Sequence, residues 1–427
     1  MAGPAPLTFF WHDYETFGRV PRRDRPAQFA GVRTDAELNE IGEPLTLYCR
    51  PAPDSLPDPE SVLLTGITPQ QALASGVPEH EFAARIESEL AREGTVGVGY
   101  NSIRFDDEVT RHLFWRNLID PYAREWSNGC GRWDLLDVVR TCWALRPEGI
   151  EWPVGEDGRP SFKLELLTRA NGLVHEAAHD ALSDVRATVS LARLIRARRP
   201  ALWDFCLRLR RKDAVWAEIG VGRPFLHLSG MYPVERGCLA IVWPLAPHPV
   251  NKNELIVWDL ACDPGELEGL DAETARRRLY TRADELPEGE QRLPIKTIHV
   301  NKSPVVIGNV TRLGTAAQRF GIAAPCAIVS SVAARVDPYR MACRLLTRLV
   351  ERGGHVYDRT TMDRMELGEH GVTLHTSRGA CVRADHVVLA AGYAGQRYLK
   401  RRVARTRSSY AFITDPIDAD TLGPFVS

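Results

Sequence analysis

The sequence lacks the features that mark secreted, membrane-spanning and zinc-finger proteins. Its nine cysteines are scattered and none stands in a CxxC spacing, so it predicts neither a zinc site nor a disulfide framework and favours a reducing compartment. No apolar run approaches the roughly 18 residues that would span a bilayer. The N-terminus lacks a basic segment followed by an apolar one and does not resemble a secretory signal. We therefore expect a cytoplasmic protein that does not bind membranes.

An excess of charge of either sign is also absent. The 427 residues include 54 Lys and Arg against 55 Asp and Glu, so any surface that binds nucleic acid must be local. A complete GxGxxG dinucleotide-binding motif is missing, because Gly97-x-Gly99 and Gly220-x-Gly222 lack the third glycine and the following helix. The length is sufficient for two or three domains.

The clearest chemical pattern is the stretch Trp11–Phe17, which follows the strand-favouring run Leu7–Phe10. Side chains of a strand alternate between its faces, so Asp13 and Glu15 should project to the same side, roughly 7 Å apart along the chain. Two carboxylates on a largely apolar strand repel each other and lose solvation. A divalent cation with a preference for oxygen, Mg²⁺ or Mn²⁺, relieves both costs. The alternative is an exposed strand end with two solvated acids.

Another acidic residue, Asp106, opens a helix just after the predicted strand Thr95–Asn101. We expect this helix to carry Val109, Leu113 and Leu118 inward. Acids at a helix N-terminus are common for capping alone, which is the alternative role of Asp106.

A further acidic residue, Asp184, lies on a helix with apolar or small residues at positions 181, 185, 188, 192 and 195, a period near 3.6. Asp184 shares this inward-facing stripe, where a carboxylate is costly to bury unless it is paired or metal-bound. His179 lies five residues earlier. An imidazole there can accept a proton near neutral pH, although a histidine near a helix start is usually a polar surface residue.

The remaining elements of the first segment follow from turn and capping signals. Thr68 followed by Pro69 predicts a helix start. The other predicted elements are an antiparallel meander with strands at Phe29–Thr34 and Leu45–Cys49, and a helix over 79–92.

An Asp-x-Glu on the first strand, a mid-domain Asp, and a His with an Asp five residues later resemble the pattern of the DEDDh 3′→5′ exonucleases. The resemblance implies that two metal ions are held by Asp13, Glu15, Asp106 and Asp184, and that His179 takes the proton from the attacking water. In such sites the ions lower the pKa of bound water and stabilise charge on the scissile phosphate and the leaving 3′-oxygen.

Longer stretches are similar to the bacterial exonuclease I family, from about residue 7 to about residue 325. They are Trp11–Gly18, Arg25–Ala30, Arg104–Arg111, Arg132–Val138, Ala144–Ile150 and Ser161–Glu165. The resemblance implies an α/β fold with a ribonuclease H-like DEDDh exonuclease domain over 1–198 and a small SH3-like β-barrel domain over 199–326. The implied activity is metal-dependent 3′→5′ hydrolysis of single-stranded DNA to 5′-mononucleotides in DNA repair and recombination. The implied state is a monomer, with single-strand DNA-binding protein as a candidate partner.

Aromatic and cationic residues are interleaved in the first segment, as in proteins that stack bases and follow a phosphate backbone. The candidate strand contacts are Arg111, Tyr122, Trp126, Arg140, Arg146, Phe162 and Lys163, whereas for Trp133 we favour a place in the core. Phe162 and Lys163 follow the flexible loop Gly155–Pro160. The resemblance adds Glu15 and the loop His299–Pro304, where His299, Asn301 and Lys302 suit phosphate contact. An ordinary polar hairpin is the alternative for that loop.

The second segment begins with a helical connector over Ala201–Glu218 and continues as short strands separated by turns, as in a small β-barrel. The predicted strands are Phe225–Leu228, Leu239–Leu245, Glu254–Leu260, Ile295–Lys302 and Val305–Ile307.

The third segment, 327–427, departs from the exonuclease I pattern, which continues with a helical domain. It resembles an internal fragment of an FAD-dependent, amino-acid-oxidase-type oxidoreductase, and without the GxGxxG unit we expect no FAD. The predicted elements are a helix with Asp337 as N-cap and Pro338 first, then strands at His355–Tyr357, Val372–Thr376 and His386–Tyr393.

Three other functions remain open on the sequence. A DEDDh ribonuclease or proofreading exonuclease would carry the same acidic residues, a flavin oxidoreductase would use the third segment, and a DNA-binding module would hold a strand without turnover.

Overall fold

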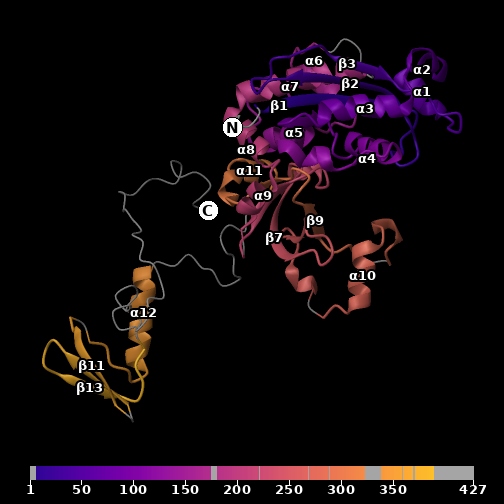
Figure 1. Cartoon of the computed structure of the whole chain (residues 1–427). Coiled ribbons are helices and arrows are strands. Elements are labelled where there is room, and N and C mark those ends of the chain that lie inside the picture. Colours follow the sequence, from indigo (N-terminus) through magenta and orange to yellow (C-terminus); the bar gives the residue numbers. More distant parts are fainter. Residues whose placement is uncertain are drawn as a thin grey trace. The chain divides into compact units, whose positions relative to one another are not determined.

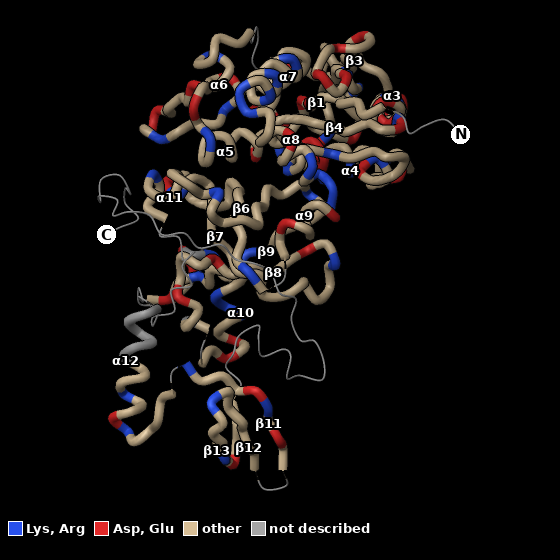
Figure 2. Tube along the Cα trace, turned by 90° about the vertical axis from the view of Figure 1, so that its left-hand side faces the viewer, with Lys and Arg blue, Asp and Glu red and all other residues tan. Residues whose placement is uncertain are grey.

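The computed structural model of the protein describes residues 6–174, 180–220, 222–267, 269–287, 289–322, 338–357, 359–368 and 371–388. The chain divides into two compact units, Met1–Val332 and Ala333–Ser427, which we describe separately. Within the first unit we call residues 6–198 the first segment and residues 199–322 the second segment. Figure 2 shows acidic and basic residues interspersed along both segments, as the balanced composition predicts.

The first segment is built on a mixed sheet of order β3-β2-β1-β4-β5. Figure 1 labels three of these strands, β1, β2 and β3. Strand β1 (Thr8–Thr16) pairs antiparallel with β2 (Pro26–Thr34), and β2 pairs antiparallel with β3 (Leu45–Tyr48). On its other side β1 pairs parallel with β4 (Thr95–Gly99), and β4 pairs parallel with β5 (Gly131–Asp134). The predicted meander and the predicted strand after residue 95 are therefore confirmed.

Helices cover this sheet. They are α1 (Pro59–Thr65), α2 (Pro69–Ser75), α3 (Glu79–Leu90), α4 (Asp106–Arg116), α5 (Leu135–Leu145), α6 (Leu164–Ala170) and α7 (Ala181–Arg198). The predicted start of α2 is confirmed, because the Thr68 hydroxyl accepts a hydrogen bond from the Gln71 N–H at 3.2 Å. Along α7 the predicted stripe at 181, 185, 188, 192 and 195 is buried.

The prediction that Leu118 packs in the core beside α4 is wrong. Val109 and Leu113 are buried, but Leu118 is 96% exposed. The helix ends at Arg116, and Leu118 lies beyond it with φ at +57°, so its side chain does not continue the helical stripe. A hydrophobic period carries no information beyond the residue at which the helix ends.

The two faces of β1 pack against different helices. Phe9 and Trp11 belong to a buried cluster that includes Val185 and Val189 of α7, whereas Phe10 and Tyr14 belong to a second cluster with helix α3. The strand alternation therefore directs Asp13 and Glu15 to the α7 side.

The second segment is a five-stranded antiparallel sheet that follows the helices α8 (Pro200–Arg208) and α9 (Lys212–Ile219). The sheet order is β10-β6-β7-β8-β9. Its strands are β6 (Phe225–Leu228), β7 (Leu239–Pro247), β8 (Glu254–Asp259), β9 (Ile295–His299) and β10 (Val305–Ile307), which confirms the predicted series. Two helices were not predicted, α10 (Ala272–Tyr280) and α11 (Ala316–Arg319).

The two segments share one hydrophobic core. Trp133 and Cys142 of the first segment and Phe225, Val242 and Val306 of the second belong to a single buried cluster. The expectation that Trp133 is a core residue is confirmed by its exposure of 1%. Because the packing is continuous, the second segment is held in a fixed position beside the first.

In the second unit, helix α12 (Pro338–Glu351) is followed by an antiparallel sheet of β11 (Met362–Gly368), β12 (Gly371–Thr376) and β13 (Cys381–Ala384). The predicted strand Val372–Thr376 is confirmed. The predicted strand His355–Tyr357 is wrong, because these residues are irregular and pair with no strand among the described residues, and strand propensity is realised only through pairing. Residues 386–388 are also irregular, and Asp337 and residues 389–393 lie outside the described residues.

Among the helices that the structure describes, none combines the length and the apolar character needed to cross a bilayer.

Candidate active site

Three carboxylates meet at the C-terminal end of β1. Single oxygens of Asp13, Glu15 and Asp184 all lie within 4.8 Å of one another, and the three side chains are half-buried. Asp13 and Glu15 share the face of β1 that packs on α7, and Asp184 lies in the first turn of that helix. Strand alternation predicted that Asp13 and Glu15 share a face, and the helical period placed Asp184 on an inward stripe, whereas their meeting was implied by the resemblance to the DEDDh exonucleases. Hard carboxylate oxygens at this spacing suit a divalent cation such as Mg²⁺ or Mn²⁺.

Asp106 of α4 lies near these three acids, close enough for its charge to act on Asp13. Its Oδ1 accepts a hydrogen bond from the N–H of Tyr14, at 3.1 Å, between the two acids of β1. The side chain is 3% exposed although it lies at the first residue of a helix. A capping acid is normally solvated, so this degree of burial favours the ligand role over the capping role.

The acids of the cluster share an unfavourable electrostatic environment. Burial, followed by the charges of Asp106 and Asp184, raises the pKa of Asp13 well above its usual range. Burial and the nearby Asp107 raise the pKa of Asp106. Burial, followed by the charges of Asp13 and Asp184, raises the pKa of Glu15 to about 9. A bound cation would offset the cost of ionising these groups.

We predict that Glu15→Gln stabilises the metal-free protein at alkaline pH. A carboxyl group whose pKa is raised on folding contributes stability below its unfolded pKa and loses that contribution as the pH rises through the folded value. In a chelator, the wild-type free energy of unfolding should therefore fall relative to the variant between about pH 4.5 and the folded pKa of about 9. A difference of about 1 kcal/mol would shift Tm by about 1–2 °C in a folded unit of this size.

Thermal unfolding across this pH range, with and without Mg²⁺, measures the effect. Glu43→Gln, at an exposed position just before β3, is the control and should follow the wild-type curve. Parallel curves for Glu15→Gln and wild type would show that Glu15 ionises normally in the folded protein.

The start of α7 is fixed by two contacts. The Asp180 side chain accepts a hydrogen bond from the Ser183 N–H at 3.1 Å, and the Ala181 N–H donates to Gln28 Oε1 at 3.4 Å. These bonds position Asp184 one turn further on. His179, the predicted proton acceptor, lies outside the described residues, so its role remains a prediction.

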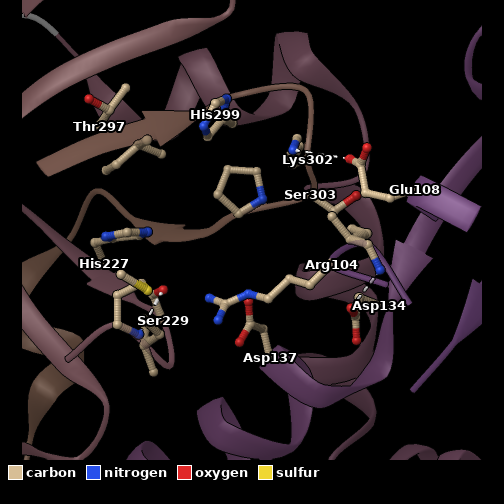
Figure 3. A pocket seen from close by; sticks show the side chains of 15 residues that line it. Arg104, Glu108, Asp134, Asp137, His227, Ser229, Thr297, His299, Lys302 and Ser303 are labelled. Carbon is tan, nitrogen blue, oxygen red and sulfur yellow. Dashed lines mark hydrogen bonds and ion pairs between the residues drawn. The ribbon is translucent and has the colours of Figure 1, made fainter. Parts of the chain in front are cut away.

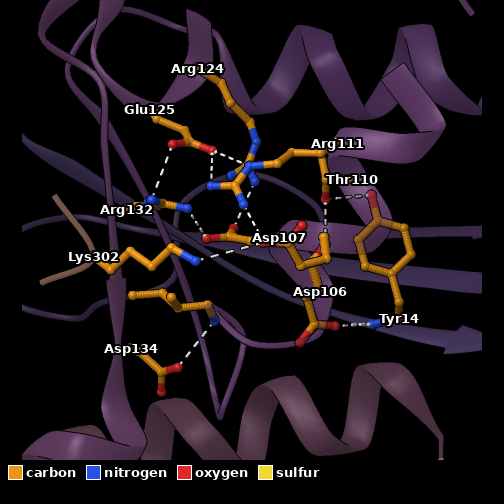
Figure 4. A network of polar contacts seen from close by, with 12 residues as sticks. Tyr14, Asp106, Asp107, Thr110, Arg111, Arg124, Glu125, Arg132, Asp134 and Lys302 are labelled. Carbon is orange, nitrogen blue, oxygen red and sulfur yellow. Dashed lines mark hydrogen bonds and ion pairs between the residues drawn. The ribbon is translucent and has the colours of Figure 1, made fainter. Parts of the chain in front are cut away.

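A network of buried charges lies behind Asp106 (Figure 4), and we call it the Asp107 network. Asp107 accepts hydrogen bonds from Arg124 at 2.6 Å and from Arg132 at 2.8 Å, and all three side chains are at most 4% exposed. The two guanidinium groups hold the pKa of Asp107 below its usual range against the cost of burial. The other members are Glu108, Arg111, Glu125 and Lys302.

Asp107, Arg124 and Arg132 are not among the predicted site residues. A signal was available for Arg132, which occupies a short buried strand beside Trp133 and must therefore have an anionic partner. Asp134 was missed as well. Its carboxylate accepts N–H bonds from Asn101 and Leu136 at 2.9 Å and from Ile103 at 3.1 Å, and burial raises its pKa to about 7.

A pocket of about 500 Å³ lies between the two segments (Figure 3). Arg104, Glu108, Asp134 and Asp137 line it from the first segment. The second segment contributes His227, Ser229, Thr297, His299, Lys302 and Ser303. The pocket thus brings the predicted phosphate-contact residues His299 and Lys302 beside the helix that begins with Asp106.

The other predicted strand contacts lie in several places. Tyr122 and Trp126 are 55% and 71% exposed, as stacking platforms must be. Lys163 is exposed. The neighbouring Phe162 packs edge-on against Trp143, with their ring centroids 5.2 Å apart. Asn301 makes a polar contact through its backbone, because its carbonyl oxygen accepts a hydrogen bond from the Arg132 guanidinium.

The predicted cations are less available than the sequence suggested. Arg111 pairs with Glu108 and Glu125, and Arg140 pairs with Asp137 at 2.7 Å. Arg146 lines a different pocket, of about 610 Å³, with Arg198, Arg199, Arg312 and the apolar Phe205 and Leu202. The structure therefore does not bring Arg146 into the pocket that contains Lys302.

Comparisons with known proteins agree with this division of the chain. A family model described as Exonuclease matches residues 10–192, and one described as Exonuclease I SH3-like domain matches residues 210–328. Exodeoxyribonuclease I of Escherichia coli strain K12 is 51% identical over 322 residues, which is 75% of this chain and 68% of the relative.

Solved structures show the same likeness. A crystal structure of E. coli exonuclease I in complex with a dA16 oligonucleotide has a TM-score of 0.72 at 48% identity, covering 81% of this chain and 71% of that one. A structure described as SSB/Exonuclease I in complex with inhibitor CFAM has a TM-score of 0.70 at 47% identity, covering 82% of this chain and 72% of the other.

Proposed function

The chain belongs to the exonuclease I family, and we propose that it hydrolyses single-stranded DNA from the 3′ end and releases 5′-mononucleotides. The observation that carries this proposal is the meeting of Asp13, Glu15 and Asp184 within 4.8 Å. A cluster of half-buried acids is costly to ionise without a cation, and bound divalent ions are what many nucleases use to hydrolyse phosphodiesters. The physiological setting that we propose is DNA repair and recombination in the cytoplasm.

The proposed ligands of two Mg²⁺ ions are Asp13, Glu15, Asp106 and Asp184, and Mn²⁺ would suit the same oxygens. When bound, such ions supply an activated water and stabilise the charge of the scissile phosphate. The backbone of β1 and the first turns of α4 and α7 hold the carboxylates in place. We propose that His179 accepts the proton of the attacking water and that Glu15 also contacts the terminal nucleotide.

We propose that the strand reaches this centre along the pocket between the segments. The reason is that His299 and Lys302 line that pocket, and that Glu108 borders both it and a second hollow lined by Arg111, Trp115 and Tyr122. Cations beside exposed aromatic faces suit a strand whose bases are unpaired. A rigid duplex has no free bases to stack there, so we expect it to be a poor substrate.

The proposal is tested by digesting 5′-end-labelled single-stranded and duplex oligonucleotides with and without Mg²⁺. We expect a descending ladder from single strands that requires Mg²⁺, with mononucleotides released and duplex spared. Preferred digestion of RNA would indicate the ribonuclease alternative. Binding without any cleavage in Mg²⁺ or Mn²⁺ would indicate a DNA-binding module.

The salt dependence of strand binding should separate two of the predicted cations. Lys163→Ala should lower the magnitude of the slope of log K against log salt by about 0.7, the value expected for one lost phosphate contact of a single strand. Arg146→Ala is the matched comparison, because Arg146 lines the other pocket. Equal slopes for Lys163→Ala and wild type would remove Lys163 from the strand path, and a change for Arg146→Ala would place it there.

For the pocket that contains Arg146 we propose a different ligand, a segment of single-strand DNA-binding protein (SSB), the candidate partner. Four arginines and one acid, Glu218, line this pocket together with apolar residues that include Phe205 and Leu202. An acidic peptide with a hydrophobic side chain would satisfy both parts of this surface. We also propose, as part of the overall function, that the chain is a monomer and is located in the cytoplasm.

The third segment of the sequence, residues 327–427, has no role in this proposed function. We propose that residues 327–427 are the fragment of FAD-oxidoreductase type expected from the sequence and that they bind no FAD. A flavin absorbance band in the purified full chain would contradict this proposal.

A further inference from the structure

One buried arginine contacts both segments of the first unit. The Arg132 guanidinium donates to Asp107 Oδ2 at 2.8 Å within the first segment and to the Asn301 carbonyl at 3.2 Å in the second. The backbone of the same residue is also used, because the Ser303 hydroxyl donates to the Arg132 carbonyl at 3.0 Å. Arg132 thus holds the loop 299–304 at two points.

The other end of this connection is next to the carboxylate cluster. Asp107, which anchors the guanidinium, follows Asp106 directly at the start of α4. Asp106 contacts the Tyr14 N–H of β1, while Asp107 faces the two arginines. Two adjacent residues of one rigid helical turn therefore contact the proposed metal centre and the support of the loop (Figure 4).

The loop that Arg132 supports carries Lys302. The Lys302 ammonium lies 3.9 Å from Glu108 Oε1 and remains about one third exposed in the pocket between the segments. A long, flexible lysine side chain contacts a phosphate at a defined place only if its backbone is fixed. Arg132, at 4% exposure, fixes that backbone without being able to reach a bound strand itself.

We propose that Arg132 is a positioning residue, which holds the loop 299–304 in register with the carboxylate cluster so that Lys302 meets a phosphate of a strand whose 3′ end lies at Asp13 and Glu15. This inference rests on the proposed function. It assigns to a buried side chain an effect on strand binding that a purely structural role would not have.

Arg124 provides a matched control within the same network. It holds the other oxygen of Asp107 at 2.6 Å and is 2% exposed at its side chain. Within the described residues its hydrogen bond is to Asp107, in the first segment, and not to the loop. Arg124→Lys and Arg132→Lys both keep a positive charge beside Asp107, so both variants avoid leaving a buried carboxylate unpaired.

The experiment is a double-mutant cycle on the full chain, with single-strand binding measured in a chelator so that no strand is cleaved. We expect Arg132→Lys to weaken binding about tenfold, or about 1.4 kcal/mol, and to lower the salt slope by about one contact, about 0.7. Adding Lys302→Ala to Arg132→Lys should change the affinity less than about twofold. Adding it to Arg124→Lys should have the full effect that Lys302→Ala has in the wild type.

Ser303→Ala tests the same connection from the loop side, because it removes the hydrogen bond to the Arg132 carbonyl and alters no charge. It should weaken binding in the same direction and by a smaller factor. Additive effects of Arg132→Lys and Lys302→Ala, with an unchanged salt slope, would show that Arg132 only stabilises the fold. If the wild type binds no single strand, the proposed function fails before the inference is tested.

Discussion

Asp13→Asn should abolish hydrolysis of a single-stranded oligonucleotide while the protein remains folded. The substitution keeps the shape of the side chain and removes one anionic ligand from a cluster in which Asp13, Glu15 and Asp184 lie within 4.8 Å. Metal ions supply several kcal/mol of transition-state stabilisation in phosphodiester hydrolysis, so we expect a loss of about 10³-fold or more in kcat/KM. Because the substitution relieves repulsion between buried acids, Tm in a chelator should not fall.

The measurements are the rate of mononucleotide release and the affinity for Mg²⁺, the latter by calorimetry. Asp204→Asn, at an exposed position of α8, is the control and should keep full activity. Chelation should cause the same loss of activity in the wild type. Added Mg²⁺ should restore the activity of the chelated wild type but not that of the variant. Turnover of Asp13→Asn near the wild-type rate would remove Asp13 from the metal site.

The fold of the first unit follows from sequence patterns to a large extent. Alternation in β1, the cap at Thr68 and the stripe of α7 each depend on interactions between near neighbours in the chain, which a sequence contains directly. Helix α10 was not predicted because it is short and rich in arginine, and none of its residues is buried, so its weak apolar stripe of Ala272, Ala275 and Leu279 is easily overlooked. Its cap was a usable signal, since Asp271 accepts from the Thr274 N–H at 2.7 Å.

The site was predictable where its geometry is local and not where it depends on tertiary contact. Asp13 and Glu15 are two residues apart on one strand, so their meeting required only the alternation of a strand. The Asp107 network combines residues from α4, β5 and the loop 299–304, and charges that pair across such distances look like ordinary solvated residues in a sequence. Arg111 and Arg140 were predicted to contact the nucleic-acid strand, whereas in the structure each is already paired with an acidic side chain.

His179→Ala should preserve binding of metal and of single strands but slow the chemical step by about 10²–10⁴-fold, the loss typical of a missing general base. The reason is its position one residue before Asp180, the cap of the helix that carries Asp184. An imidazole with an unperturbed pKa near 6.5 accepts a proton only above that pH, so the wild-type rate should rise through it. In His179→Ala this acidic limb of the pH–rate profile should disappear.

Two other groups of the site must be separated from His179 in that profile. Burial, followed by the charge of Arg124, lowers the pKa of His12 to about 4, so His12 cannot account for a limb near neutrality. Asp134 can account for such a limb, because burial raises its pKa to about 7. The measurement is therefore the single-turnover rate against pH for His179→Ala, Asp134→Asn and the exposed His80→Ala as control. A limb that survives in His179→Ala and is lost in Asp134→Asn would assign the titration to the carboxylate that holds the loop before α4, and would leave His179 without the role of base.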